Sequence, residues 1–258
     1  MSVLLAAVDS SAAAQPVLAV ARELARLTGA EVEAVSVDHL EAPATADAMT
    51  RAAHVRVHRR SGGVARAIQS LARERDAVAV VVGARGLPSG ASPAGHVTLE
   101  LVQSLDVPVA VVPPQATPRT IQRVLVAVEG DGESHALRHL VRHLVHGPSL
   151  EIVALHVFEP DALPLFGDQP VLETEAWAEE FGRRALRESA HDVRVEARVG
   201  LAPRALCQAA RDLEVDLVMV AWHRNLGGGH GRIVRQLLAE SDVPVLLVPI
   251  VRVADETR

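Results

Sequence analysis

Two short segments of the chain have the residue types and spacing of a phosphate-binding site. Gly83 and Gly86 follow an apolar run, and eight residues later Gly95 opens the segment Gly95-His96-Val97-Thr98. Glycine allows a close approach of the backbone, and the amides at a helix N-terminus attract anions. The spacing predicts an anion site where a strand turns into a helix. The alternative interpretation is that these glycines only shape the turn.

Two further residues are expected at the same edge of a sheet. Asp9 ends the first apolar run of the chain, and Val37 ends the second. In open parallel sheets, ligands bind at the carboxyl ends of the strands, next to the point where the strand order reverses. We therefore expect Asp9 and Val37 to lie near the two glycine segments.

The elements that must position these residues alternate between apolar runs and segments of helical spacing. Runs without polar alternation predict strands buried on both faces of a parallel sheet. These strands are expected near residues Val3–Val8, Glu31–Val37, His54–His58, Val78–Gly83 and Val107–Val112. Helical spacing of apolar residues covers Ala12–Leu27, Val64–Arg73 and Val97–Ser104. The alternation predicts an α/β fold with a doubly wound sheet.

The pattern occurs twice in the chain. The segment Ser104–Pro113 matches Glu240–Pro249 at a separation of 136, and Val3–Asp9 matches the segment that contains Val124–Glu129 at 120. A repeat of this size indicates duplication of a whole domain, with a longer segment after the second strand of the second copy. We predict a first copy at residues 1–114 and a second at 120–251, joined by a proline-rich linker.

The first copy resembles the universal stress protein family, and in particular its ATP-binding members. The resemblance rests on Asp9, the Gly83-x-x-Gly86 pair, the Gly95 segment and the following Val107-Pro108-Val109, and it extends over both copies. It implies an adenine-nucleotide alpha-hydrolase-like fold with strand order 3-2-1-4-5 in each copy. It also implies that the last strands, Val107–Val112 and Val243–Val248, pair within one chain as a pseudo-dimer; a homodimer is left open.

The resemblance further implies an adenine nucleotide, ATP or a relative, with Mg²⁺ as a candidate companion ion. Asp9 and Val37 would border adenine and ribose, and the two glycine segments would hold ribose and phosphates. The implied nucleotide-binding residues are Asp9, Val37, Val82, Gly83, Arg85, Gly86, Gly95, His96, Val97 and Thr98.

One position departs from the family pattern. His96 stands where the family has a phosphate-binding serine or threonine, and the glycine loop is one residue short. The backbone amide is retained, so the imidazole would either donate to a phosphate or block it. Two functions follow: a nucleotide-binding regulatory protein, or a nucleotide-free interaction and scaffold module of stress-related type.

The second copy departs further, which predicts a degenerate site. Glu129 replaces the aspartate, Ala221–Arg224 replaces the glycine pair, and Gly231-Arg232-Ile233-Val234 replaces the phosphate segment. We expect this copy to be kept for packing, with binding of a different anion as the alternative. Candidate residues for such a second site are Glu129, Val157, His223, Arg224, Gly231 and Arg232.

Three histidines invite a metal interpretation. His135, His139 and His143 follow one another at intervals of four on a segment of helical spacing, opposite its apolar face. Imidazoles at i and i+4 can chelate zinc, copper or nickel. Arg138 and Arg142 lie between these histidines, so a solvent-facing polar stripe is the favoured interpretation, and no metal site is predicted.

Composition limits the remaining classes of function. The formal net charge of −6 argues against nucleic acid or an anionic membrane as a partner. A single cysteine, Cys207, and the lack of an apolar stretch of about 20 residues favour a cytoplasmic protein. The chain has no lysine, and residues 83–98 contain no Asp or Glu that could hold Mg²⁺. We therefore predict that the protein is not an enzyme.

Overall fold

The computed structural model describes residues 2–9, 14–38, 55–84, 94–128, 150–159, 176, 178–181, 193–227 and 229–250. The first copy contains strands β1 (Val3–Ala7), β2 (Glu31–Asp38), β3 (Arg56–Ser61), β4 (Ala77–Gly83) and β5 (Val109–Val112), and helices α1 (Ala14–Thr28), α3 (Val64–Glu74) and α4 (His96–Ser104). The second contains strands β6 (Arg123–Ala127), β7 (Glu151–Phe158), β8 (Val193–Val199), β9 (Leu217–Trp222) and β10 (Val245–Pro249), and helices α7 (Ala202–Asp212) and α8 (Gly229–Glu240).

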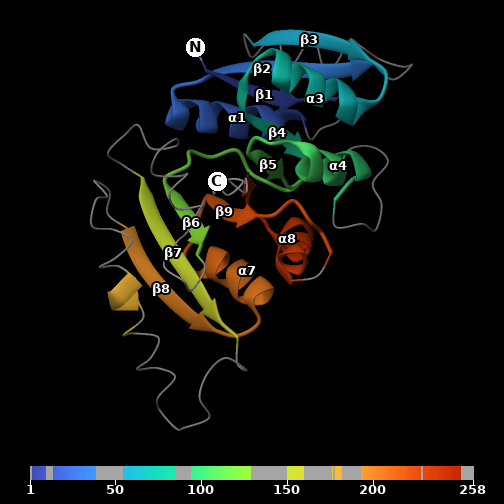
Figure 1. Ribbon diagram of the computed structural model, residues 1–258. Helices are drawn as coiled ribbons and strands as arrows, with labels where there is room; N and C mark the ends of the chain where they lie inside the picture. The colour runs from blue at the N-terminus through green and yellow to red at the C-terminus, as the bar shows by residue number, and fades with distance from the viewer. Residues whose placement is uncertain are drawn as a thin grey trace, which may run out of the picture.

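The strands form one continuous sheet of ten, in the order β3-β2-β1-β4-β5-β10-β9-β6-β7-β8 (Figure 1). Each half has the predicted order 3-2-1-4-5. All neighbours within a half are parallel, and β5 and β10 join the halves as an antiparallel pair. The predicted pairing of the two last strands within the chain is therefore confirmed.

Apolar side chains pack on both faces of the sheet, as the continuous runs predicted. One core cluster joins α1 residues such as Leu24 to Val124 and Val126 of β6. The cluster on the other face joins Ile68 of α3 to Leu206 of α7. Both clusters contain residues of both copies, so burial of apolar surface stabilises the two halves as one unit.

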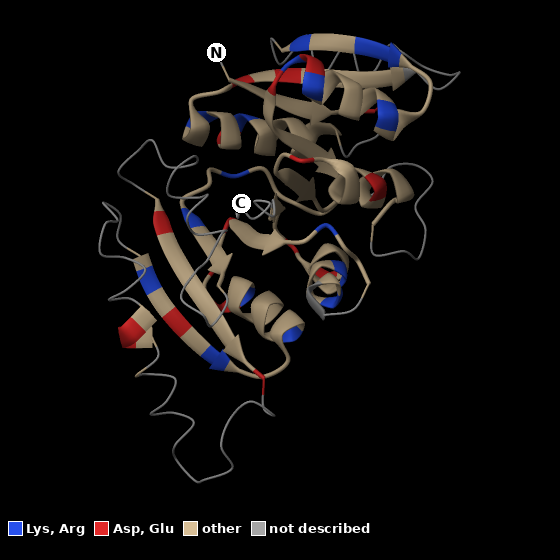
Figure 2. Ribbon diagram, viewed as in Figure 1, with Lys and Arg blue, Asp and Glu red and all other residues tan. Residues whose placement is uncertain are grey.

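The third strand differs from its expected position. The sequence predicted His54–His58, whereas β3 spans Arg56–Ser61. β3 lies at the edge of the sheet, where side chains are only partly buried and apolar runs are not needed. Figure 2 shows charged residues along both edge strands, β3 and β8. Charged edges oppose pairing with a further strand.

A buried carboxylate attaches β3 to the sheet. Glu33 of β2 has 3% of its surface exposed. It accepts hydrogen bonds from Arg75 Nη2 at 2.6 Å and Arg75 Nε at 2.8 Å, and His58 Nε2 of β3 lies 2.8 Å from its Oε2. Burial acts to raise the pKa of Glu33, but the hydrogen bonds from Arg75 and His58 outweigh it and hold the pKa below its ordinary value.

The strand registers confirm the repeat. Val3 lies opposite Glu31, and Arg123 opposite Glu151, which keeps the separation of 120. The third strands are instead related at 138, and each is followed by a glycine with positive φ, +98° at Gly62 and +150° at Gly200. The additional residues of the second copy therefore lie between its second and third strands, as expected.

The linker between the copies is held by side chains from both of them. Asp216 accepts hydrogen bonds at 2.9 Å from the amides of Gln122 and Arg123, and it pairs with Arg119 at 2.7 Å. From the first copy, Glu23 of α1 accepts the Ile121 amide at 3.1 Å. The linker is thus a bonded part of the interface between the copies. Within the described ranges, no helix has the length and apolar character needed to cross a membrane.

Candidate functional site

The residues predicted from the first copy gather at the carboxyl edge of its strands. Asp9 follows β1, Val37 is the penultimate residue of β2, and Gly83 ends β4. Because β1 lies between β2 and β4, these three positions surround the point where the strand order reverses. Asp9 is exposed and Val37 is half-buried, whereas Val82 points into the core with 3% exposure. The Val82 side chain therefore packs in the core and stabilises the end of β4.

Backbone hydrogen bonds hold helix α4 against the end of β4. The Gly95 amide donates to the Ala84 carbonyl at 2.8 Å, and the Ala84 amide donates to the Val112 carbonyl of β5 at 2.7 Å. Gly95 is the N-cap of α4, in extended conformation and without a side-chain capping bond. His96, Val97 and Thr98 form the first turn of α4, so their amides have no carbonyl four residues back within the helix. Such amides can cradle an anion.

The three side chains of this turn have different surroundings. His96 is exposed, and Val97 is half-buried against the core. Thr98 is buried, and its Oγ1 donates to the Gly83 carbonyl at 2.8 Å. The Thr98 hydroxyl thus fixes the end of β4, and only its backbone amide is left for a ligand. Arg85 and Gly86 lie outside the described residues.

The corresponding helix of the second copy begins earlier. Helix α8 starts at Gly229, two residues before Gly231, which is the repeat counterpart of Gly95. Ile233 and Val234 are therefore the fifth and sixth residues of the helix, and their amides bond to carbonyls within it. The preceding connection, residues 223–228, is half as long as residues 84–95 of the first copy. The phosphate cradle predicted from the first copy is not repeated here.

The shorter connection also packs directly on the start of α8. A Cβ added to Gly231 would lie 2.5 Å from the Asn225 carbonyl oxygen and 2.6 Å from the Leu226 carbonyl carbon. Arg235 of α8 donates to the Leu226 carbonyl. Glycine is therefore required at position 231, because the backbone of the connection lies directly against it.

The other residues proposed for a second site have mixed surroundings. Arg224 pairs with Asp106 of the first copy, and Arg232 lies 3.6 Å from Glu159. Val157 lies half-buried in β7 and His223 is exposed after β9, while Glu129 lies outside the described residues. Arg224 therefore bridges the two copies.

Two further side chains of the second copy, Trp222 and Cys207, are buried. Trp222 is the last residue of β9 and is 1% exposed, so it packs in the core and has no face open to a base. Cys207 is a buried free thiol, and burial raises its pKa. His135, His139 and His143 lie outside the described residues. Within the part of the chain that is described, no group of three His, Cys, Asp or Glu side chains could hold a metal ion.

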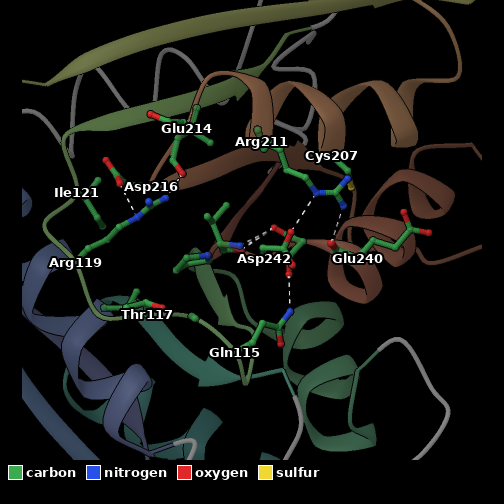
Figure 3. A pocket seen from close by; sticks show the side chains of 17 residues that line it. Gln115, Thr117, Arg119, Ile121, Cys207, Arg211, Glu214, Asp216, Glu240 and Asp242 are labelled. Carbon is green, nitrogen blue, oxygen red and sulfur yellow. Dashed lines mark hydrogen bonds and ion pairs between the residues drawn. The ribbon is translucent and has the colours of Figure 1, made fainter.

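One feature of the structure had no signal in the sequence. A cavity of about 580 Å³ lies between the linker and the second copy (Figure 3). Gln115 and Arg119 of the linker, Arg211 of α7 and Asp242 before β10 line it, together with Val20 of α1. The proline-rich composition of the linker marked only a boundary between copies. Only the folded arrangement brings these distant segments around one space.

Comparison with known proteins agrees with the geometry. The model of the universal stress protein family matches residues 39–113 and 120–249, one match in each copy. The first match begins after Asp9. The assignment of Asp9 to the site therefore rests on the repeat and on the strand register. A search of curated proteins finds no match.

Solved structures of similar fold cover nearly the whole chain. A functionally unknown protein from Pseudomonas aeruginosa PAO1 is 14% identical, with a TM-score of 0.70 over 96% of this chain and 92% of its own. A universal stress protein from Archaeoglobus fulgidus DSM 4304 is 15% identical, with a TM-score of 0.63 over 96% of both chains. At this identity the likeness concerns the fold.

Proposed function

Because the chain belongs to the universal stress protein family, we propose that it is a regulatory protein that binds ATP or a related adenine nucleotide in its first copy. One contrast between the copies carries this assignment. In α4 the amides of Val97 and Thr98 lie in the first turn, whereas their counterparts Ile233 and Val234 lie in the second turn of α8. Only the first set is available to phosphate oxygens.

The remaining groups of the first copy suit the other parts of a nucleotide. Asp9 is exposed beside the ends of β1 and β2, where a carboxylate accepts hydrogen bonds from ribose or adenine. Val37 offers an apolar contact for the base. The exposed imidazole of His96 at the helix N-terminus would donate to a phosphate.

We assign the bound nucleotide a regulatory role, because residues 83–98 supply no carboxylate for Mg²⁺ or for a general base. Any Mg²⁺ would then be held by the phosphates and by residues outside this segment. Occupancy would act at the N-terminus of α4, a helix that contacts β5, the strand that joins the first copy to the second.

Calorimetric titration of nucleotide-stripped protein with ATP, with and without Mg²⁺, tests the proposal through its stoichiometry. We expect one site per chain. Two sites would contradict the restriction to the first copy. Absence of binding at millimolar ATP would overturn the proposal and favour the nucleotide-free interaction module.

A further inference from the structure

Strand β8 (Val193–Val199) ends the sheet in the second copy, and among the described residues β7 is its only neighbouring strand (Figure 1). The Gly200 amide donates to the Phe158 carbonyl of β7 at 2.9 Å, which shows the side to which each residue of β8 turns its backbone groups. Because these groups alternate along a strand, the even-numbered residues 194–198 face β7 and the odd-numbered residues 193–199 face outward. The outward amides and carbonyls form an edge to which another strand can bond.

The two edge strands correspond in the repeat but differ in charge. Residues 55–61 read Val-Arg-Val-His-Arg-Arg-Ser, and residues 193–199, at a separation of 138, read Val-Arg-Val-Glu-Ala-Arg-Val. Three positions differ: Glu196 replaces His58, Ala197 replaces Arg59, and Val199 replaces Ser61. Like charges on opposite strands repel, so the basic edge of β3 opposes pairing with itself. The β8 edge contains both signs of charge and lacks this protection.

The three differences make β8 complementary to itself in one antiparallel register. When Ala197 lies opposite Ala197 of a second molecule, Glu196 lies opposite Arg198, and Val195 lies opposite Val199. Opposite charges and apolar pairs then meet across the two strands. A centre at Glu196 would instead bring two glutamates together, and a centre at Arg198 two arginines. A centre at Val195 would leave Val199 without an opposite residue in the strand.

The same register covers two exposed apolar side chains. Val199 is 50% exposed and Leu201 is 51% exposed. In this register Val199 packs beside Val195 of the second molecule, and Leu201 follows it beyond the end of the strand, towards Val193. Removal of this apolar surface from water favours association. A two-fold axis through the Ala197 pair repeats every contact, as in an isologous interface.

The charged side chains of β8 are balanced in such a pair. Within one molecule, Arg194 pairs with Glu196 at 2.5 Å, and Arg198 pairs with Asp212 of α7 at 2.8 Å. Arg198 also lies 3.9 Å from Glu196 of its own strand. Each molecule therefore brings two guanidiniums and two carboxylates to the contact. The combined cluster has no net formal charge, so no charge is left unmatched when water is excluded.

We propose that the outer edge of β8 is the contact surface for a second molecule of this protein, in an antiparallel β8–β8 pair centred on Ala197. The pair continues the ten-stranded sheet of one molecule into the next. The occupant is a second molecule because the complementarity is that of β8 with itself. This surface lies in the second copy and does not depend on the proposed nucleotide site.

Sedimentation equilibrium of the full chain, at concentrations up to about 1 mM, tests the proposal. We expect a monomer–dimer equilibrium that Ala197→Arg weakens by at least about tenfold, because it places like charges opposite each other at the axis. The first copy has arginine at this position of β3, so the fold accommodates the change. Arg59→Ala, at the counterpart in β3, is the matched control and should leave the association unchanged.

A charge exchange tests the register itself. Glu196→Arg and Arg198→Glu each place like charges opposite each other and should be monomeric alone, whereas their equimolar mixture restores opposite charges and should form a heterodimer. Circular dichroism checks that each variant is folded. A dimer that survives Ala197→Arg would place the interface elsewhere and overturn the proposal. A parent protein that is monomeric at every concentration, or a mixture of folded variants that does not associate, would overturn it as well.

Discussion

Ala110 lies directly opposite Leu246 in the antiparallel β5–β10 pair, and the two residues occupy the same position in the two copies. They are separated by 136 residues, as are Pro108 and Pro244 in the repeated segment. The flanking pairs, Val109 with Leu247 and Val111 with Val245, exchange under the same relation. A local two-fold axis therefore passes through the Ala110–Leu246 pair, as in an isologous dimer interface.

The first prediction concerns this pair. Leu246 is 1% exposed, and truncation to alanine leaves a cavity between the two copies. We expect Leu246→Ala to lower the free energy of unfolding by about 2–5 kcal/mol, measured by urea denaturation. Val78→Ala, at a side chain that is 37% exposed, should cost far less. Equal losses in the two variants would contradict the central role of β10.

The second prediction concerns nucleotide affinity. A carboxylate that bonds to the nucleoside contributes about 1.5–3 kcal/mol, so Asp9→Ala should weaken ATP binding by about ten- to 150-fold in calorimetry. Glu129→Ala changes the repeat counterpart in the second copy and should leave affinity unchanged. The reverse pattern would place the nucleotide in the second copy.

The third prediction concerns Thr98, whose hydroxyl donates to the Gly83 carbonyl at the end of β4. Thr98→Val leaves the Gly83 carbonyl without this donor and should cost about 1–3 kcal/mol of stability. Thr98→Ser keeps the hydroxyl and should retain most of the stability. The counterpart in the second copy is Val234, which is fully buried, so valine is accommodated at this position of the fold. If the serine variant were the less stable of the two, the methyl group would matter more than the hydrogen bond.

The fourth prediction is a pH dependence centred on Glu33. Its pKa in the folded protein is lower than its ordinary value of about 4.3, so its contribution is fully present above that value. The contribution is lost as the pH falls through the folded pKa. Glu33→Gln should therefore be less stable than the parent protein at pH 7, with the difference shrinking towards pH 3. Urea denaturation at several pH values measures it, and a difference that grows on acidification would contradict the assignment.

The fifth prediction concerns Asp216, which accepts two amides at the start of β6 and pairs with Arg119. In Asp216→Ala these two amides lose their acceptor, so the linker should open more often. We expect faster trypsin cleavage after Arg119 and Arg123, followed by mass spectrometry. Asp106→Ala, which removes an exposed partner of Arg224, is the control and should not change linker cleavage.

Much of the architecture could be predicted from the sequence. Continuous apolar runs such as Val78–Gly83 indicate strands buried on both faces, and the repeated Asp-Val-Pro-Val segment indicates duplication. The order of the strands and the pairing of β5 with β10 followed from the family resemblance. The edge strand β3 was misplaced, because a strand with one open edge does not need an apolar sequence.

Hydrophobic periodicity and repeat spacing are properties of the chain alone, and they are sufficient to predict that two similar α/β units follow one another. Three features depend on tertiary packing: the Thr98 hydroxyl donates to the Gly83 carbonyl, α8 begins before Gly231, and Arg224 pairs with Asp106. Each depends on which groups lie within hydrogen-bond distance after packing, and residues far apart in sequence carry no local sign of that distance. The cavity beneath the linker has the same origin, since its charges come from segments that meet only in the folded sheet.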